Sequence, residues 1–300
     1  MIKLTFFNSN FWAKKIKSWK FWAVLISSLI VIWLVFSAYL YTQSKSLIFN
    51  NKVSWAPVPA YGYEIDFVRN KEGQNVSMWY FPSQSTDKVI LYLHGNAGRI
   101  ADYFENLKQY GSVLSPAYPG YHESEGHPTP ENTYEAAMLA YDYLVSTKKV
   151  PENKIIILGH SMGGSPATYL ASQKPKAKKL ILINTFSSVQ SMCYRQYSIF
   201  CVFAGNIFNT AKYAQEVKIP VRQFVYKGDL TVPPEEGKKL FTYFKNEDKK
   251  LVELDQYTHV YFDFNKVFSE IIESKLHIYI KNHKFIYLTV KFDNDGKYNH

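Results

Sequence analysis

The chain opens with one long apolar stretch and then changes to short apolar runs separated by amphipathic segments. No charged residue occurs from Phe21 to Tyr41, in FWAVLISSLIVIWLVFSAYLY. A helix of this length spans about 30 Å, the thickness of the hydrocarbon core of a bilayer. Trp19, Trp22 and Tyr39 lie near its two ends, where amphipathic rings prefer the membrane interface. The pattern predicts an uncleaved single-pass membrane anchor over this stretch.

Two other structures fit the same stretch, a cleaved signal peptide and a buried core helix. The run is longer than the apolar part of a typical signal peptide, and SAYLYTQ offers no A-x-A-like cleavage site. The charges around the span are uneven, because only Lys45 and Lys52 follow it closely. Lysine-rich flanks stay in the cytoplasm, so we expect residues 1–20 to be a basic cytoplasmic segment and the body of the protein to lie across the membrane. The lysines before the span, with no acidic residue among them, are Lys3, Lys14, Lys15, Lys17 and Lys20.

Beyond residue 60 apolar runs of strand character alternate with helical periodicity. The clearest helix begins at Thr129-Pro130, a cap followed by proline at the first helical position. The first two strand-like runs resemble an antiparallel pair, and several later runs are continuously apolar, as in parallel strands buried on both faces. After a linker over 42–60, we expect one α/β domain over 61–284, a mostly parallel sheet flanked by helices, and a tail at 285–300 whose role the sequence does not indicate. The strand-like runs are YEIDFV, VSMWYF, KVILYLHG, SVLSPAY, KIIILG, KLILIN, VRQFVYKGD and KKLVELD.

Composition and charge narrow the functional classes. The hydrophobic fraction of 47% supports a sizeable core. The formal net charge is +10, but the lysines are scattered and no motif of a nucleic-acid-binding module occurs, so a solvated basic surface is the better interpretation. With only Cys193 and Cys201, the chain is not a disulfide-built scaffold. These two could bond if the chain loops back between them, whereas on one continuous helix they would lie about 12 Å apart. The sequence leaves the pair undecided.

Candidate chemistry begins at IIILGHSMGG, residues 155–164, where a strand ends in a glycine-rich turn. One interpretation is that Ser161 caps a helix. The other is that Ser161 is a nucleophile on a strained turn between strand and helix, which requires small residues at Gly159 and Gly163 because larger side chains would collide with neighbouring elements. The apolar strand before and the helix-compatible SPATYLASQK after favour the nucleophile.

A serine hydroxyl needs a base, and the base needs an orienting carboxylate. Asp229 follows one predicted strand in a tight Gly-Asp turn, and His259 follows the last strand. Because ligand sites lie at the carboxyl ends of parallel strands, we predict that Asp229 and His259 complete a triad with Ser161. An ordinary Asx turn and a surface histidine are the alternatives. Three later histidines fit the required loop position poorly: His277, His283 and His300.

The tetrahedral intermediate of such a reaction needs two backbone N–H donors. We assign one to Met162, directly after the nucleophile at a helix N-terminus, and the other to Asn96 in the HGNAG loop. His94 and His160 flank the site, and we expect them to be structural. The reaction requires no metal or organic cofactor.

These motifs resemble the α/β-hydrolase superfamily, and more narrowly its Bem46-like branch of membrane-anchored serine hydrolases. The matching stretches appear in family order over residues 46 to about 275, and the resemblance implies the same triad. The chain departs from the branch at His122, where glycine is usual, and at Thr258, before the predicted base. The matching stretches are SLIF, YLHGNAG, AYPGYHESEGHPT, GHSMGG, NTFSS, VYKGDLTVPPEEGKKL and the His259 region.

The segment 186–218 lies where this superfamily inserts its lid, and it is short and aromatic. An apolar cover would suit an acyl chain, although simple helix packing explains the composition equally well. We therefore expect a membrane-anchored serine hydrolase that acts on a carboxylic ester or thioester, with a small-molecule or lipid-like acyl substrate. A peptidase or amidase on the same triad, and a non-catalytic binding protein on a hydrolase fold, are the alternatives.

Overall fold

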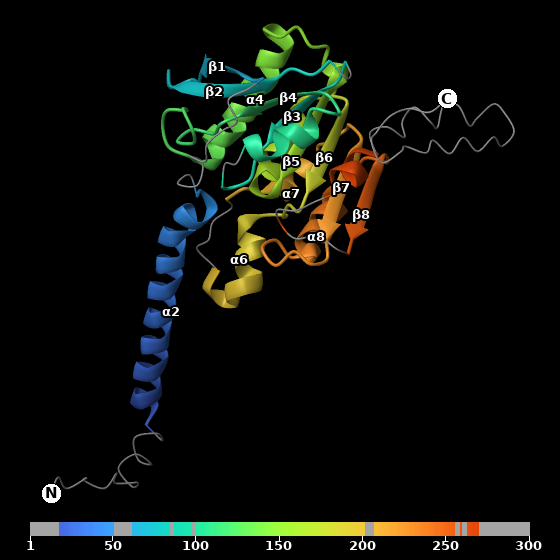
Figure 1. Cartoon of the computed structure of the whole chain (residues 1–300). Coiled ribbons are helices and arrows are strands. Elements are labelled where there is room, and N and C mark those ends of the chain that lie inside the picture. The colour runs from blue at the N-terminus through green and yellow to red at the C-terminus, as the bar shows by residue number, and fades with distance from the viewer. Residues whose placement is uncertain are drawn as a thin grey trace, which may run out of the picture. The chain divides into compact units, whose positions relative to one another are not determined.

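The alternation of strands and helices produces one mixed sheet, seen here in a computed structural model. The structure describes residues 18–50, 62–84, 87–97, 100–201, 207–255, 259 and 263–269. Within these residues eight strands form a sheet in the order β1-β2-β4-β3-β5-β6-β7-β8 (Figure 1). The β1–β2 and β2–β4 pairs are antiparallel and the others parallel, so the predicted α/β fold is confirmed. The strands are β1 (Glu64–Arg69), β2 (Asn75–Phe81), β3 (Val89–Leu93), β4 (Ser112–Pro116), β5 (Ile155–His160), β6 (Lys179–Ile183), β7 (Val221–Tyr226) and β8 (Lys249–Leu254).

The centre of the sheet is the core of the domain. Every residue of β3, β4, β5 and β6 is buried, whereas the two outermost strands, β1 and β8, are partly exposed. The central strands therefore need apolar side chains on both faces, which explains their continuous apolar runs in the sequence.

Helices α4, α5, α7 and α8 contact one another in that order and form one layer against the sheet. α4 begins where predicted, since the Thr129 side chain accepts a hydrogen bond from the Asn132 N–H and Pro130 is the first helical residue. Only the 3-10 turn η4 (Ser161–Gly163) separates α5 from the end of β5. These helices are α4 (Pro130–Ser146), α5 (Gly164–Gln173), α7 (Thr210–Ala214) and α8 (Pro234–Tyr243), and the shorter helical segments before β4 and β5 are η2 (Ala101–Tyr103), α3 (Phe104–Leu107) and η3 (Glu152–Lys154).

The apolar N-terminal stretch forms helix α2 (Trp19–Ile48), which continues beyond Tyr41. Its part from Trp19 to Thr42 is long and apolar enough to cross a membrane, and 6% of its most apolar window is buried. Such exposure is unlike that of a helix in the core of a soluble domain.

The segment 186–218, predicted as the lid, contains a disulfide that the sequence left undecided. Helix α6 (Val189–Tyr197) ends at Ser198, whose φ is +51°, and the 3-10 turn η5 (Ser198–Cys201) follows. The reversal brings the Cα atoms of Cys193 and Cys201 to 5.7 Å, and the two sulfurs are bonded. We call residues 189–201 the lid hairpin.

A buried carboxylate holds the lid hairpin to the domain. The side chain of Glu236, on α8, accepts hydrogen bonds from Ser187 Oγ at 2.9 Å and from Ser191 Oγ at 2.8 Å. Arg195 Nε lies 3.5 Å from the same carboxylate. A buried charge is stable only when it is paired and hydrogen-bonded, so these contacts fix the polar side of α6 against α8.

The chain divides into two units, Met1–Phe262 and Asp263–His300. In the second unit residues 264–269 are helical. His277, His283, His300 and the tail at 285–300 lie outside the described residues, as does Thr258.

Candidate active site

Ser161 stands on a strained turn at the carboxyl end of β5. Its φ is +54°, in the left-handed region that costs an L-residue about 1–2 kcal/mol. A Cβ added to Gly159 would lie 2.6 Å from Ala167 Cβ, and one added to Gly163 would overlap the Leu93 carbonyl oxygen. The close approach of helix and strand therefore requires both glycines, as the sequence predicts.

Ser161, His259 and Asp229 are hydrogen-bonded in series. His259 Nε2 lies 2.8 Å from Ser161 Oγ, and His259 Nδ1 lies 2.7 Å from Asp229 Oδ2. The other oxygen of Asp229 accepts the backbone N–H groups of Thr231 at 2.8 Å and Val232 at 2.9 Å. The Asp229 side chain is fully buried, so these donors hold the carboxylate in one orientation. Because Nδ1 donates to the carboxylate, Nε2 is left as the acceptor for a proton from Ser161.

The HGNAG loop lies against this series, since a Cβ on Gly95 would be 3.4 Å from Ser161 Cβ. His94 Nδ1 donates to the Gly95 carbonyl oxygen at 2.8 Å. That carbonyl and the Asn96 N–H belong to one trans peptide group and point in opposite directions. His94 therefore orients the peptide whose N–H is the predicted oxyanion donor.

Two tyrosines and the residue Asn50 fix the rest of this loop. Tyr118 Oη donates to the His94 carbonyl oxygen at 3.2 Å, and Tyr121 Oη donates to the Asn96 carbonyl oxygen at 2.8 Å. The backbone N–H of Asn50, just past α2, donates to the same Asn96 carbonyl at 3.2 Å. Burial raises the pKa of both tyrosines, so their hydroxyls stay protonated and remain donors.

Comparison with known proteins relates the chain to proteins of the α/β-hydrolase fold. Residues 88–198 match the model of the alpha/beta hydrolase fold family. The chain is 28% identical to Protein bem46 of Schizosaccharomyces pombe over 59% of its own length and 63% of the relative. It is 31% identical to the lysophosphatidylserine lipase ABHD12 of Danio rerio over 54% of its length and 49% of the relative. The chain has the α/β-hydrolase fold and is similar to Bem46-like proteins. The alignments thus span between about half and two thirds of these relatives.

The fold of this α/β hydrolase is also that of solved structures. An alpha-beta hydrolase from Vibrio vulnificus superposes with a TM-score of 0.62, at 19% identity, over 78% of this chain and 91% of that one. The departure at His122 has a structural consequence, because its φ of +47° is a conformation that glycine adopts without strain. In this conformation the centroid of the His122 ring lies 4.9 Å from the centroid of the Trp79 ring, so the two rings pack together.

His160 holds the backbone of His259. Its Nε2 donates to the backbone carbonyl of His259 at 2.8 Å. Burial, followed by the nearby His259, lowers the pKa of His160 to about 3, and burial lowers the pKa of His94 to about 3. Both rings are therefore neutral at neutral pH and each provides one N–H donor to the backbone, which agrees with their predicted structural role.

We expect the free energy of unfolding to fall as the pH drops below about 6.5, because of His94 and His160. The unfolded chain protonates these histidines near pH 6.5, but the folded chain binds no proton there until about pH 3. Each contributes a loss of about 1.4 kcal/mol per pH unit across this window. Unfolding of the detergent-solubilised protein at a series of pH values measures the slope.

Two variants keep the hydrogen bond and remove the titration, His94→Asn and His160→Gln. Each should reduce the proton uptake on unfolding between pH 4 and 6 by about one proton. An unchanged slope in both variants would contradict the buried neutral state of the two rings.

No pattern in the sequence had indicated that Tyr118 and Tyr121 hold the HGNAG loop or that Glu236 holds the lid hairpin. The tyrosines lie in AYPGY, which follows a buried strand, and a hydroxyl in such a run needs a buried acceptor. That requirement is the signal that could have drawn attention to them. Nothing in the local sequence distinguishes Glu236 from the exposed Glu235 beside it.

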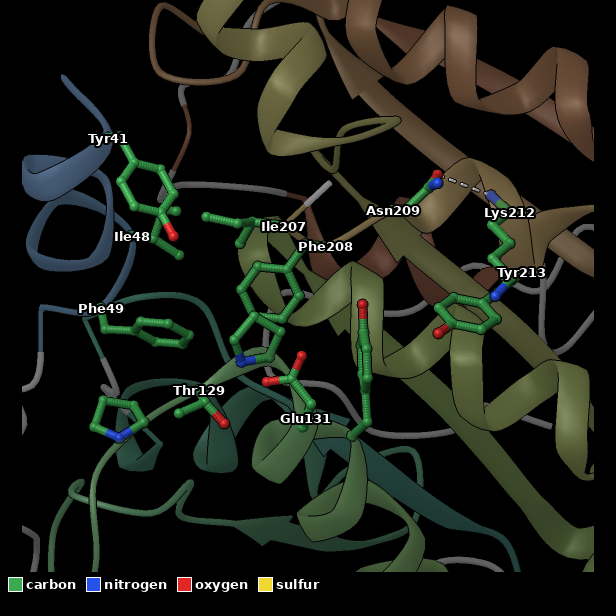
Figure 2. Close-up of a pocket in the computed structure, with 13 residues that line it drawn as sticks. Tyr41, Ile48, Phe49, Thr129, Glu131, Ile207, Phe208, Asn209, Lys212 and Tyr213 are labelled. Carbon is green, nitrogen blue, oxygen red and sulfur yellow. Dashed lines mark hydrogen bonds between the residues drawn. The ribbon is translucent and has the colours of Figure 1, made fainter. Parts of the chain in front are cut away.

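A cavity of about 490 Å³ opens between the end of α2 and the lid segment (Figure 2). Tyr41, Ile48 and Phe49 form one wall, and Ile207 and Phe208 form the facing wall. Polar side chains that line the cavity include Glu131 and Lys212. The mixture of apolar walls and a few polar groups is typical of small-molecule sites.

Proposed function

We propose that this protein is a membrane-anchored serine hydrolase that cleaves a carboxylic ester or thioester through an acyl-enzyme. The observation that carries the proposal is the hydrogen-bonded series from Ser161 through His259 to Asp229, with Ser161 held at a positive φ. A helix-capping serine would need neither a strained backbone nor a histidine oriented by a buried carboxylate.

In the proposed reaction Ser161 Oγ attacks the acyl carbon while its proton passes to His259 Nε2. Asp229 holds the ring and stabilises the imidazolium that forms. The oxygen of the tetrahedral intermediate accepts the N–H groups of Asn96 and Met162. The bond from the acyl carbon to the leaving oxygen or sulfur then breaks, and the leaving group takes the proton from His259. Water next attacks the acyl carbon and gives a proton to His259 Nε2, the bond to Ser161 Oγ breaks, and that proton returns to Ser161 as the acid leaves.

The proposed class of substrate depends on the cavity near α2 and on a similar protein, and not on the triad. The apolar walls of the cavity beside the end of α2 and the likeness to a protein named a lysophosphatidylserine lipase both favour a lipid-like acyl ester. The same residues could cleave an amide, because the triad does not by itself determine the leaving group.

The test is a matched panel of substrates with the full chain in detergent micelles. We expect p-nitrophenyl esters to react at least 100-fold faster than p-nitroanilides of the same acyl chain. Faster cleavage of the anilides would assign the protein to the amidases. A protein that shows no turnover and no covalent labelling by a fluorophosphonate would favour the alternative of a non-catalytic binding protein.

We infer that α2 crosses the membrane with the N-terminus in the cytoplasm and the hydrolase domain on the other side. Two independent features favour this orientation. The lysine excess precedes the apolar span, and the lid hairpin contains a disulfide, which persists in oxidising compartments.

Protease added to sealed cells or spheroplasts should therefore degrade the hydrolase domain and leave a membrane fragment ending near residue 41. A domain protected until the membrane is opened would reverse the orientation. A mature N-terminus beyond residue 41 would show that the apolar stretch is a cleaved signal peptide.

A further inference from the structure

The lid hairpin lies directly against α2. Trp33 Nε1, on α2, donates a hydrogen bond to the backbone carbonyl of Ile199, at the tip of the hairpin, at 3.0 Å. Ser37 is buried and Leu40 is half-buried, although most of the surrounding helix is exposed. These positions are spaced four and three residues apart, so they lie on one face of the helix. The hairpin packs against α2 on the face that contains Trp33.

The contact lies at membrane depth if α2 spans a bilayer. Trp33 precedes Thr42, the end of the candidate span, by nine residues, which is about 13 Å along the helix axis. The hydrocarbon core is about 30 Å thick, so this position lies within the half of the core nearest the hydrolase domain. The tip of the hairpin reaches the same depth because it is bonded to Trp33.

The hairpin has the chemistry of a membrane-inserted element. Its polar side faces the domain, where Ser191 and Arg195 meet Glu236. Three large side chains of the hairpin are exposed: Tyr194 at 43%, Tyr197 at 36% and Ile199 at 63%. An amphipathic segment of this kind buries its apolar face at a membrane surface.

The backbone carbonyl of Ile199, at the tip of the hairpin, also has a hydrogen-bond partner that would remain in lipid. A carbonyl exposed to hydrocarbon without a partner is costly, and the Trp33 indole supplies the partner of Ile199. The disulfide between Cys193 and the buried Cys201 closes the hairpin, so the tip does not depend on water to hold its shape.

We propose that the lid hairpin inserts into the bilayer beside α2, so that the hydrolase takes its ester substrates directly from the membrane. The proposal rests on the function proposed above. It commits to the lipid bilayer as the partner of Tyr194, Tyr197 and Ile199, because these side chains are held next to a helix that is itself long and apolar enough to span one.

A cavity lies beside the end of α2 that is nearest the domain. Tyr41 and Ile48 are seven residues apart, about 10 Å along the helix, and both line the cavity of Figure 2. Two residues beyond Ile48, the Asn50 N–H binds the Asn96 carbonyl oxygen. The cavity and the HGNAG loop thus both lie beside the end of α2.

The first experiment locates the hairpin. The full chain is reconstituted into phosphatidylcholine vesicles that contain a phosphatidylcholine with a diazirine in its acyl chain, and labelled peptides are mapped after irradiation. We expect labels on peptides from 21–41 and from 189–201, and none on β1. Labels on the anchor peptides alone would overturn the proposal, and would indicate that a protein or water covers the hairpin.

The second experiment measures the consequence for substrates. Ile199→Glu places a charge at the tip, and Phe67→Glu places one at an exposed apolar position of β1, 53% exposed. We expect Ile199→Glu to lower kcat/KM at least 10-fold for a long-chain ester embedded in vesicles and to leave a water-soluble acetyl ester unchanged. Phe67→Glu should change neither rate. Equal loss on both substrates, or no loss on either, would overturn the proposal.

The two proposals fail in different ways. A wild-type protein that hydrolyses neither ester would contradict the proposed function, while the photolabelling of the wild type would still decide whether the hairpin is inserted. Because the photolabelling needs no substitution, it also stands if Ile199→Glu does not fold.

Discussion

Replacing Ser161 with alanine is expected to abolish covalent labelling by a fluorophosphonate and to lower ester hydrolysis by at least 10⁴-fold. The hydroxyl is the group that His259 deprotonates, at 2.8 Å, and no acyl-enzyme forms without it. Labelling is followed by mass spectrometry of the peptide that contains residue 161, and hydrolysis by release of p-nitrophenol.

Ser165→Ala is the matched control for this change. Ser165 is a buried serine one helical turn farther along the same segment, and its hydroxyl is hydrogen-bonded to Tyr134 at 3.0 Å instead of to the histidine. We expect the control to remain labelled at Ser161 and to keep most of its activity. Labelling that persists in Ser161→Ala would remove this residue from the proposed role.

Replacing Asp229 with asparagine is expected to lower kcat/KM for esters by about 10³- to 10⁴-fold with little change in fold. The asparagine oxygen can still accept the N–H groups of Thr231 and Val232, so the turn is preserved. Its amide group then donates to His259 Nδ1 and shifts the ring proton to Nε2. An imidazole in that form cannot accept the proton of Ser161, which is 2.8 Å away.

Two comparisons test this interpretation. Asp255→Asn removes an exposed carboxylate just past β8, ion-paired with Lys227, and should leave the rate nearly unchanged. The double variant Asp229→Asn/His259→Ala should be little slower than His259→Ala alone, because the three groups act as one unit. A well-folded His259→Ala protein with near-normal activity would transfer the role of base to another histidine, with His277 and His122 the first to test.

The sequence by itself determined the parts of this protein that depend on neighbouring residues. Apolar runs of strand length predicted the strands, because the central strands are buried on both faces. Thr129-Pro130 predicted the start of α4, because a helix terminus is satisfied within one turn. The glycines around Ser161 predicted a strained turn, because the steric limit acts over two residues on either side. The apolar stretch from Phe21 to Tyr41 predicted a helix long enough to span a membrane, because its length and lack of charge are local properties.

The tertiary structure decided which distant residues meet. It brought the Asp229–His259 pair to Ser161, as chain order suggested, but it also placed His94 on the Gly95 carbonyl and Tyr121 on the Asn96 carbonyl, which no local pattern indicated. The disulfide in the lid hairpin depended on whether the chain reverses between its two cysteines, which Ser198 achieves at a positive φ.

The contact between Trp33 and Ile199 is the extreme case, since 166 residues separate its two ends. Periodicity and capping reflect how a segment interacts with residues close to it in the sequence. They contain no information about a residue from a distant part of the chain that contacts the segment in the folded protein. Hydrogen bonds between buried groups far apart in sequence depend on the complete sheet order and on the path of each loop. For that reason the candidate nucleophile was evident in the sequence, whereas the groups that hold its surroundings in place became evident only in the folded chain.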